Sequence, residues 1–187
     1  MLEATLKLIS EKGYLGSTTR EISLEAGVTE LTLFRHFGTK EKLFEELLNH
    51  HTFLPRLKEL LPELDNLSPE QALRLIASRF LVSLKERKSM VKIMYSEVTI
   101  YPDKIKKVYN KFIDDLRVTL ASYFRELQRK GMLKKVTPEM AAQVFLGMLF
   151  SYFRSEEIMR GGMTKNKMEK NIKEFVDIFM FGTMVNE

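Results

Sequence analysis

Four side chains that can donate hydrogen bonds to anions lie close together near the N-terminus: Arg20, Arg35, His36 and Lys40. A guanidinium group can form a bidentate contact with guanine, and any of these cations can bind a phosphate oxygen. Two other polar residues lie among them. The methyl group of Thr32 can approach thymine, and the carboxylate of Glu30 can accept a hydrogen bond from cytosine. This chemistry suits contact with duplex DNA, provided that the fold holds these side chains on one face.

The residues around these side chains predict a first short helix and a turn. Thr18 followed by Glu21 forms a capping box, which defines where the helix begins. Ile22 and Ala26 are four residues apart and therefore face the interior together. Gly27 follows, where the chain must leave the helix, and glycine tolerates the left-handed backbone that this requires.

A second short helix follows this turn. Thr29 is suited to cap its start, Leu33 and Phe37 are four residues apart and bury one face, and Gly38 ends it. Two short helices joined by a glycine-containing turn form a helix-turn-helix, whose second helix enters the DNA major groove. We therefore expect a DNA-binding segment in which this second helix reads base pairs.

At these residues the chain resembles the TetR family of transcriptional repressors, whose signature runs roughly TT-x-x-I-A-x-x-A-G-V-S-x-G-T-L-Y-x-H-F-x-S-K-E-x-L. The matching residues are Thr18, Thr19, Ile22, Ala26, Gly27, Val28, Thr32, Leu33, His36, Phe37, Lys40, Glu41 and Leu43. The resemblance implies an all-α fold, with an N-terminal three-helix DNA-binding domain over residues 1–45. An effector-binding and dimerisation domain would cover residues 46–187.

The same resemblance implies a function. It predicts a homodimeric transcriptional repressor that a small-molecule effector releases from a pseudo-palindromic DNA operator, although activation instead of repression stays open. It assigns phosphate-holding positions to Thr19, His36 and Lys40. Lys40 also begins a helix, where its charge opposes the helix dipole, so a phosphate partner would explain it.

The other residues of the segment receive individual predictions. Arg35 is expected to pair with guanine, and Arg20 can reach a base or a phosphate. Glu30 can accept from cytosine or simply interact favourably with the helix dipole, and both interpretations stay open. Leu31 stands where the family commonly has a small residue, and it can pack on a thymine methyl group. Phe34 replaces a common tyrosine, so we expect it to pack and to contact sugar.

The predicted DNA-binding set is therefore Thr18, Thr19, Arg20, Thr29, Glu30, Leu31, Thr32, Phe34, Arg35, His36 and Lys40. Net charge does not support it by itself. The chain carries +5, but residues 1–52 contain six Lys or Arg and eight Glu, so the basic excess lies elsewhere. A helical protein-interaction module without sequence-specific DNA binding stays open as an alternative.

Several other classes are not indicated. The chain has no cysteine, so it has no disulfide and no thiol chemistry. His50 and His51 are adjacent and point apart on a helix, so we expect no metal site. Neither a Ser-His-Asp signature, a Walker loop nor a GxGxxG motif is present, and we expect neither an enzyme nor a cofactor. The longest uncharged run, 140–153, is too short to span a bilayer. We expect a cytoplasmic regulator without a membrane partner.

Helical patterns continue to the C-terminus. We expect helices over 40–54, ended or bent by Pro55, and then over 69–88, 90–99, 102–130, 137–159 and 165–184. The segment 137–159 is apolar on more than one side, so it must be covered on two sides. By the resemblance, the last two helices form the dimer interface, with Phe150, Phe153, Phe175 and Phe179. A buried helix in a monomer is the alternative.

The resemblance also implies an effector pocket between the bent helix, the long middle helix and the first dimer helix. These segments offer Phe53, Met90, Met94, Tyr95, Tyr109, Phe112, Phe145 and Met148. Because the set is rich in aromatic residues and methionine, we expect a largely apolar effector, either lipid-like or aromatic. Met94→Trp should then abolish the response to effector and spare DNA binding. The same side chains can instead fill a solid core.

Overall fold

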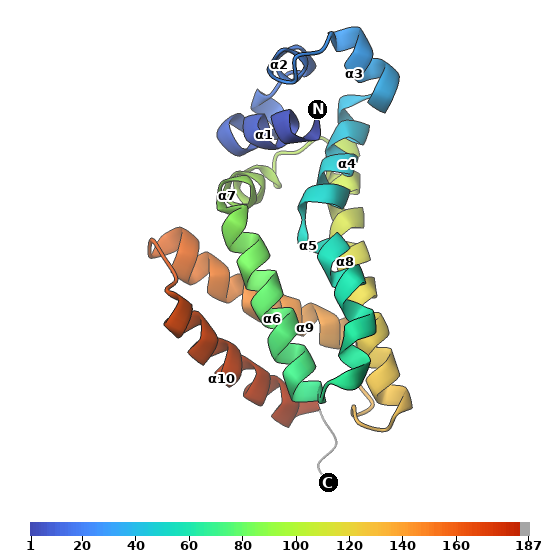
Figure 1. Cartoon of the computed structure of the whole chain (residues 1–187), viewed down its shortest axis with the longest axis vertical. Helices are drawn as coiled ribbons and strands as arrows, with labels where there is room; N and C mark the ends of the chain where they lie inside the picture. The colour runs from blue at the N-terminus through green and yellow to red at the C-terminus, as the bar shows by residue number, and fades with distance from the viewer. Residues whose placement is uncertain (184–187) are drawn as a thin grey trace. The chain divides into compact units, whose positions relative to one another are not determined.

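The computed structural model describes residues 1–183, and its regular elements over that range are helices, which confirms the all-α prediction (Figure 1). The DNA-facing segment belongs to the first four helices: α1 (Leu2–Gly16), α2 (Thr19–Glu25), α3 (Glu30–Phe37) and α4 (Lys40–His51). The helices that follow are α5 (Phe53–Leu60), α6 (Pro69–Glu86), α7 (Lys88–Glu97), α8 (Asp103–Arg129), α9 (Pro138–Phe153) and α10 (Lys165–Thr183). The predicted end of the last helix, Met184, lies outside the described residues.

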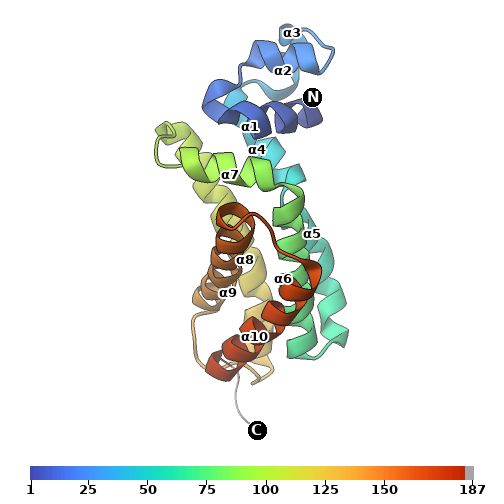
Figure 2. The same ribbon diagram turned by 90° about the vertical axis from the view of Figure 1, so that its left-hand side faces the viewer.

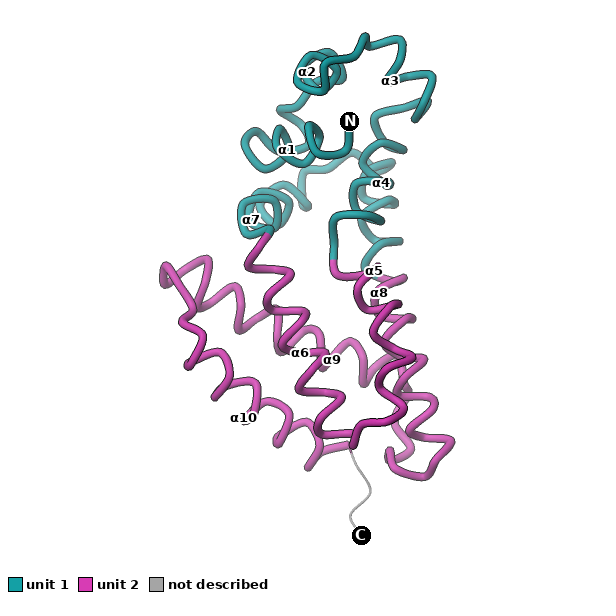
Figure 3. The backbone as a smooth tube through the Cα atoms, viewed as in Figure 1, with its two compact units in different colours: residues 1–52, 87–113 teal, residues 53–86, 114–187 magenta. Residues whose placement is uncertain are grey.

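The chain divides into two compact units (Figure 3). Unit 1 contains Met1–Thr52 and Arg87–Ile113, and unit 2 contains Phe53–Glu86 and Asp114–Glu187. Unit 1 therefore joins the first four helices to α7 and to the beginning of α8. The domain boundary predicted after residue 45 would divide α4, whereas the packing keeps that helix whole within unit 1.

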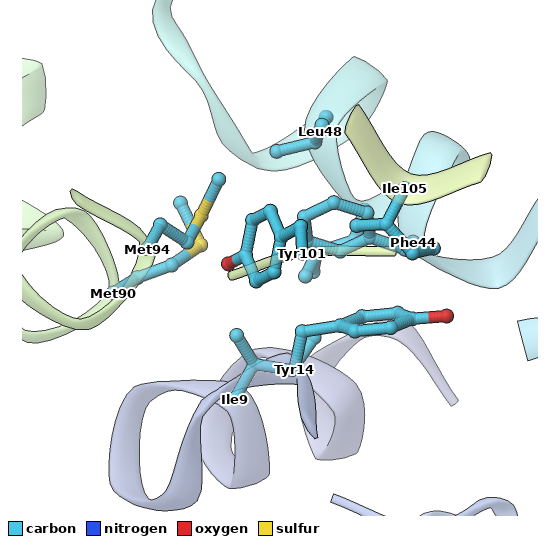
Figure 4. Packing of buried hydrophobic residues seen from close by; sticks show 9 residues of the cluster. Ile9, Tyr14, Phe44, Leu48, Met90, Met94, Tyr101 and Ile105 are labelled. Atoms are coloured by element: carbon cyan, nitrogen blue, oxygen red, sulfur yellow. The ribbon is translucent and has the colours of Figure 1, made fainter. Parts of the chain in front are cut away.

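Unit 1 is organised around α1, which packs against both α4 and α7. Helices α1 and α7 lie side by side in both views (Figure 1 and Figure 2). Their shared core consists of Ile9, Tyr14, Phe44, Leu47, Leu48, Met90, Met94, Tyr101 and Ile105. Figure 4 shows the ring of Tyr101 in the middle of this cluster, with its hydroxyl on the side of Met90 and Met94. Removing these apolar surfaces from water stabilises the junction of the three helices.

In unit 2, α6 packs against α5, α9 and α10. Its buried stripe contains Leu73, Ile76, Phe80 and Leu81, at the helical spacing that the sequence predicts. The ring of Phe179 on α10 contacts two further buried rings, with centroid distances of 5.4 Å to Phe124 and 5.0 Å to Phe145. Unit 2 thus has an aromatic core of its own.

One of the predicted helix ends is wrong. The helix that begins at Lys40 ends at His51, because Thr52 adopts an extended backbone and its Oγ1 donates to the carbonyl of Leu48 at 2.6 Å. Pro55 lies in the first turn of α5, where its missing N–H leaves no helical hydrogen bond unformed. The break is therefore three residues earlier than the proline suggests.

The segment predicted as a helix over 137–159 is helical to Met159 as predicted, but the type of helix changes within it. Helix α9 ends at Phe153, and a π-helical turn covers Arg154–Met159. The wider turn buries two consecutive carboxylates. Glu156 pairs with Lys167, and the Oε2 atom of Glu157 accepts from the backbone N–H of Met163 at 2.8 Å. Both buried acids therefore have partners within this turn and the segment that follows it.

Candidate DNA-binding site

A small core holds the helix-turn-helix in position. Leu8 of α1, Ile22 of α2, Leu33 of α3 and Leu43 of α4 are buried together. Ile22 and Leu33 are the inward residues that the sequence predicts, and both are fully buried. Their burial fixes the orientation of α2 and α3, and so decides which side chains of these helices face solvent.

The predicted capping box at the start of α2 is confirmed. The Oγ1 atom of Thr18 accepts from the N–H of Glu21 at 3.1 Å, and the Oε2 atom of Glu21 accepts from the N–H of Thr18 at 2.9 Å. Lys12 of α1 donates to the other oxygen of Glu21 at 2.7 Å. The hydrogen bond from Lys12, followed by those from Thr18, lowers the pKa of Glu21 to about 2. The start of α2 is therefore fastened to α1.

The predicted turn and the ends of α3 are also confirmed. Gly27 has a φ of +66°, in the left-handed region that glycine tolerates. Thr29 caps α3, since its Oγ1 accepts from the N–H of Thr32 at 3.2 Å. The hydroxyl groups of Thr29 and Thr32 are also hydrogen-bonded to each other, at 2.8 Å. Gly38 ends α3 with a φ of +76°.

The exposed surface of α2 and α3 contains most of the predicted DNA-facing side chains. Arg20, Arg35 and His36 are exposed, and within residues 1–183 neither arginine forms an ion pair. Leu31 is 60% exposed and Phe34 is 41% exposed, so both add apolar surface to this face. The arrangement offers two unpaired guanidinium groups for base or phosphate contacts.

Two predicted residues contact each other instead of standing free. The hydroxyl of Thr19, at the start of α2, donates to the Oε1 atom of Glu30, at the start of α3, over 2.5 Å. Both side chains are half-buried. From the sequence, we predict two separate DNA contacts. Spacing along a helix identifies neighbouring side chains only within that helix, so it cannot pair residues of α2 and α3.

Lys40 has partners within unit 1. Its Nζ atom donates to the backbone carbonyl of Tyr14 at 2.5 Å and lies 4.2 Å from the centroid of the Tyr14 ring. Burial lowers the pKa of Lys40. The contact with Tyr14 accounts for a cation at the start of α4 without a phosphate, and phosphate binding by Lys40 stays a prediction.

Sequence patterns do not reveal the role of Glu97 on α7. Its Oε2 atom accepts from the backbone N–H of Tyr14 at 2.9 Å, beside a kink where Gly13 has a φ of +77°. A Cβ atom at position 13 would lie 2.0 Å from the Oε1 atom of Glu97, so any residue other than glycine would force this carboxylate to move. The one sequence signal is a glycine inside an otherwise helical pattern, which can mark a close approach.

Two family models together match most of the chain. Residues 1–47 match the bacterial regulatory proteins of the tetR family, and residues 71–181 match the AefR-like transcriptional repressor C-terminal domain. The chain belongs to the TetR family. It is therefore a TetR-type, DNA-binding transcriptional regulator and not an enzyme.

Three similar proteins align with nearly the full length of this chain. The HTH-type transcriptional regulator YvkB of Bacillus subtilis is 28% identical over 182 residues, which cover 97% of this chain and 94% of YvkB. The fatty acid degradation regulator FadR of Bacillus halodurans has a TM-score of 0.80 at 16% identity and covers 97% of this chain and 96% of its own. FadR of Bacillus subtilis, solved with stearoyl-CoA, has a TM-score of 0.76 at 17% identity, with the same coverage. At these identities the two solved structures show a shared fold.

The predicted effector-binding residues of this TetR protein fall into both units. In unit 1, Met90 and Met94 are buried in the shared core, with Tyr109 and Phe112 packed against it, and Tyr95 is 43% exposed. In unit 2, Phe53 packs against Phe80 at 5.2 Å between ring centroids, Phe145 is fully buried, and Met148 is half-buried. The structure therefore brings together Met90, Met94, Tyr109 and Phe112, and their part in a pocket stays a prediction.

Two of the predicted dimer contacts face the interior of their own unit. Phe153 is fully buried and Phe179 is 4% exposed, so neither offers area to a second copy. Phe150 and Phe175 are half-buried, and Phe175 packs on Tyr152. The apolar side chains that are exposed on α9 and α10 are instead Met140, Val144, Ile178 and Phe181. The sequence identifies helices with two apolar sides but does not tell which side is internal.

The chain's three histidines line one groove in unit 1, with a cavity volume of about 820 Å³. His50 pairs with Glu46 at 3.3 Å, and His51 pairs with Glu3 at 3.7 Å. In the part of the chain that the structure describes, no group of three His, Cys, Asp or Glu side chains is arranged to hold a metal ion. Over the same residues, no helix is both long and apolar enough to cross a membrane.

Proposed function

We propose that the protein is a homodimeric repressor that occupies a pseudo-palindromic operator and leaves it when a small, largely apolar effector binds. The observation that carries the DNA-binding part is the exposed face of α2 and α3, with Arg20 and Arg35 unpaired within the described residues. Unpaired guanidinium groups on a helix-turn-helix are suited to bind phosphate and guanine. Bound there, each helix α3 would read one half-site.

The homodimer is supported by the exposed apolar side chains of unit 2. Ile178 is 66% exposed and Phe181 is 81% exposed on α10, and Val144 on α9 is 51% exposed. Covering such side chains with a second copy would remove them from water and stabilise the pair. Two-fold proteins match pseudo-palindromic operators, because the two recognition helices then meet equivalent half-sites.

The proposed class of effector is supported by the apolar side chains of the candidate pocket and by a protein with the same fold. The candidate lining residues that the structure brings together in unit 1, such as Met94, Tyr109 and Phe112, are aromatic or thioether side chains. A relative with the same fold, FadR of Bacillus subtilis, was solved with stearoyl-CoA. We therefore propose a lipid-like effector for this chain, with an acyl chain as its apolar part.

The experiment has two stages. Operator sequences are first selected from a pool of random duplex DNA, and the affinity of the best site is measured against salt concentration. We expect a two-fold symmetric site and an affinity that falls as salt rises, because bound phosphates release counterions. Acyl-CoA esters, free fatty acids and planar aromatic compounds are then titrated onto the complex. Failure of every compound to release the DNA would contradict the proposed effector class.

A second candidate is a helical protein-interaction module. Leu24 on α2 is 81% exposed, and together with Leu31 and Phe34 it adds exposed apolar surface to α2 and α3. Residues 1–52 also carry more acidic than basic side chains. The salt dependence separates the two candidates, since DNA binding weakens steeply with salt and apolar docking does not. Selection of no DNA sequence would favour the interaction module.

A further inference from the structure

The hydrogen bond between Thr19 and Glu30 changes what each residue can do at the DNA surface. A carboxylate only accepts hydrogen bonds, so the Thr19 hydroxyl is the donor in this 2.5 Å contact. Its proton is therefore not available to a phosphate oxygen while the contact persists. The contact also holds the Glu30 side chain in one orientation at the start of the recognition helix α3.

Glu30 keeps one free acceptor. Its Oε1 atom is taken by Thr19, and within residues 1–183 no donor contacts its Oε2 atom. A carboxylate close to DNA is repelled by phosphates, so it contributes favourably only where the DNA offers it a hydrogen-bond donor. In the major groove these donors are the amino groups of cytosine and adenine.

Cytosine fits this acceptor better than adenine does. In the major groove, cytosine presents only its N4 amino group, whereas adenine presents the N7 acceptor beside its N6 amino group. The N7 lone pair would face the negative charge of Glu30 and weaken the contact. Guanine and thymine present acceptors in place of an amino group, so they would repel the carboxylate.

We propose that Glu30 is a specificity-determining residue that accepts a hydrogen bond from a cytosine amino group in each half-site, and that Thr19 is its positioning residue. This inference rests on the proposed operator binding and names one base pair that the operator must contain. It departs from the phosphate-holding role that the family resemblance implies for Thr19. It also chooses between the two interpretations of Glu30 that the sequence leaves open.

The main test compares base preferences at every position of the selected operator. Wild-type protein should prefer cytosine at one position of each half-site. Glu30→Gln keeps the size of the side chain but adds an amide donor, and a glutamine amide pairs with adenine. We expect its discrimination in favour of cytosine to fall by about tenfold, the loss that follows removal of one good base contact. Preferences at the other positions should stay as in wild type.

Glu30→Asp is the matched control for the helix dipole. It keeps the negative charge in the first turn of α3, so an effect through the dipole alone would leave the base preference unchanged. Because its side chain is one methylene shorter, the proposed contact would be lost and the preference for cytosine should weaken. Thermal unfolding of both variants, followed by circular dichroism, checks that the fold is intact.

Substitutions at Thr19 test the positioning role. Thr19→Val removes the hydroxyl and keeps the shape, so it should broaden the preference at the same base pair and leave the salt dependence unchanged. Thr19→Ser keeps the hydroxyl and should behave as wild type. A phosphate contact by Thr19 would instead weaken binding to all sequences about equally.

The outcomes separate this inference from the proposed function. If wild-type protein selects no operator, the proposed function and the inference fail together. If it selects an operator but Glu30→Gln and Glu30→Asp retain its base preferences, the inference alone is overturned. A uniform loss of affinity in Thr19→Val, with the cytosine preference intact, would overturn the positioning role of Thr19.

Discussion

The ammonium group of Lys40 binds the backbone carbonyl of Tyr14 at 2.5 Å and lies over the ring of the same residue. Glu97 accepts from the backbone N–H of Tyr14, so side chains of α4 and α7 satisfy both polar backbone groups of one α1 residue. These contacts compensate for the helical hydrogen bonds that the kink at Gly13 disrupts. Tyr14 thereby joins three helices of unit 1.

Replacing Lys40 with methionine should destabilise the protein. The variant keeps most of the apolar stem but loses a charged hydrogen bond and a cation–π contact. We expect the free energy of unfolding to fall by about 1–3 kcal/mol, measured by urea denaturation. Lys42→Met is the matched control, because Lys42 is exposed and forms no ion pair within the residues described. Equal stability of the two variants would contradict the role of the Tyr14 contact.

DNA binding by a second variant, Lys40→Ala, provides a separate measurement. If Lys40 also holds a phosphate, as the family resemblance implies, Lys40→Ala should weaken binding to all sequences and lower the salt slope by about one unit per site. If Lys40 serves only the contact with Tyr14, the salt slope should stay at the wild-type value. The slope therefore distinguishes a phosphate contact from a structural one.

Gly13→Ala should be strongly destabilising, and Glu97 should determine how strongly. An added Cβ would lie 2.0 Å from the Oε1 atom of Glu97, and a backbone with φ +77° and ψ 174° costs a residue other than glycine about 1–3 kcal/mol. Removing the carboxylate with Glu97→Ala eliminates the clash but not the backbone strain. The double variant should thus be more stable than the sum of the single effects predicts, by about 0.5–3 kcal/mol in a double-mutant cycle.

Gly162→Ala is the control for this cycle. Position 162 has no left-handed φ, and nothing lies within 4 Å of an added Cβ atom. We expect a change in unfolding free energy within about 0.5 kcal/mol, as for ordinary surface substitutions. Strict additivity of Gly13→Ala and Glu97→Ala would show that the carboxylate does not determine the residue at position 13.

Arg35→Ala should weaken operator binding by roughly 1–3 kcal/mol and relax specificity at one base pair in each half-site. Arg35→Lys retains the charge but loses the bidentate geometry, so it should lose specificity with less loss of affinity. Titration of both variants on operators changed at single positions provides the measurement. Equal binding by wild type and Arg35→Ala would remove Arg35 from the residues that read bases.

The local part of the site could be predicted from the sequence because its chemistry is local. The capping box joins Thr18 and Glu21, which are three positions apart, and the left-handed Gly27 and Gly38 lie at the ends of their helices. The contact of Glu97 with Tyr14 joins positions that are 83 residues apart, and no short-range pattern signals it. The pairing of Thr19 with Glu30 was likewise not predictable, since it depends on how two helices pack.

Helix periodicity also leaves one question open for unit 2. It identifies Phe175 and Phe179 as members of one apolar stripe, because they are four residues apart. The structure buries Phe179 and leaves Phe175 only half-buried, whereas Phe181, outside the stripe, is 81% exposed. Which apolar side of a helix faces its own core depends on neighbouring helices, so the sequence pattern alone does not tell which apolar residues stay exposed.

Ile178→Asp and Phe181→Asp test the proposed homodimer. Both side chains are exposed in the single chain, so a charge there should not disturb the core of unit 2. In a dimer, each would bury an unpaired charge, and we expect monomers at micromolar concentration by analytical ultracentrifugation. Lys173→Asp, exposed on the same helix, is the control and should leave the assembly intact. Wild-type protein that sediments as a monomer would contradict the homodimer itself.

The effect of enlarging Met94 is expected to differ from what the sequence suggests. Met94 is 5% exposed in the cluster that contains Tyr14 and Phe44. Met94→Trp should therefore overpack unit 1, lower its unfolding free energy by about 1–3 kcal/mol and weaken DNA binding. Met148→Trp, at a half-buried position of α9, should instead block release by effector and spare operator affinity. Urea denaturation measures the unfolding free energy, and operator titrations with and without acyl-CoA measure DNA binding and release.

Helices α1 and α4, which support the helix-turn-helix, share a core with a later stretch of the chain, since unit 1 combines residues 1–52 with residues 87–113. As the protein leaves the ribosome, α1 and α4 emerge before Met90, Met94 and Tyr101, which complete their core. Until then the apolar faces of Ile9 and Phe44 remain open to water and to other nascent chains. A gene fragment that stops after α4 would encode an aggregation-prone peptide instead of a portable DNA-binding module.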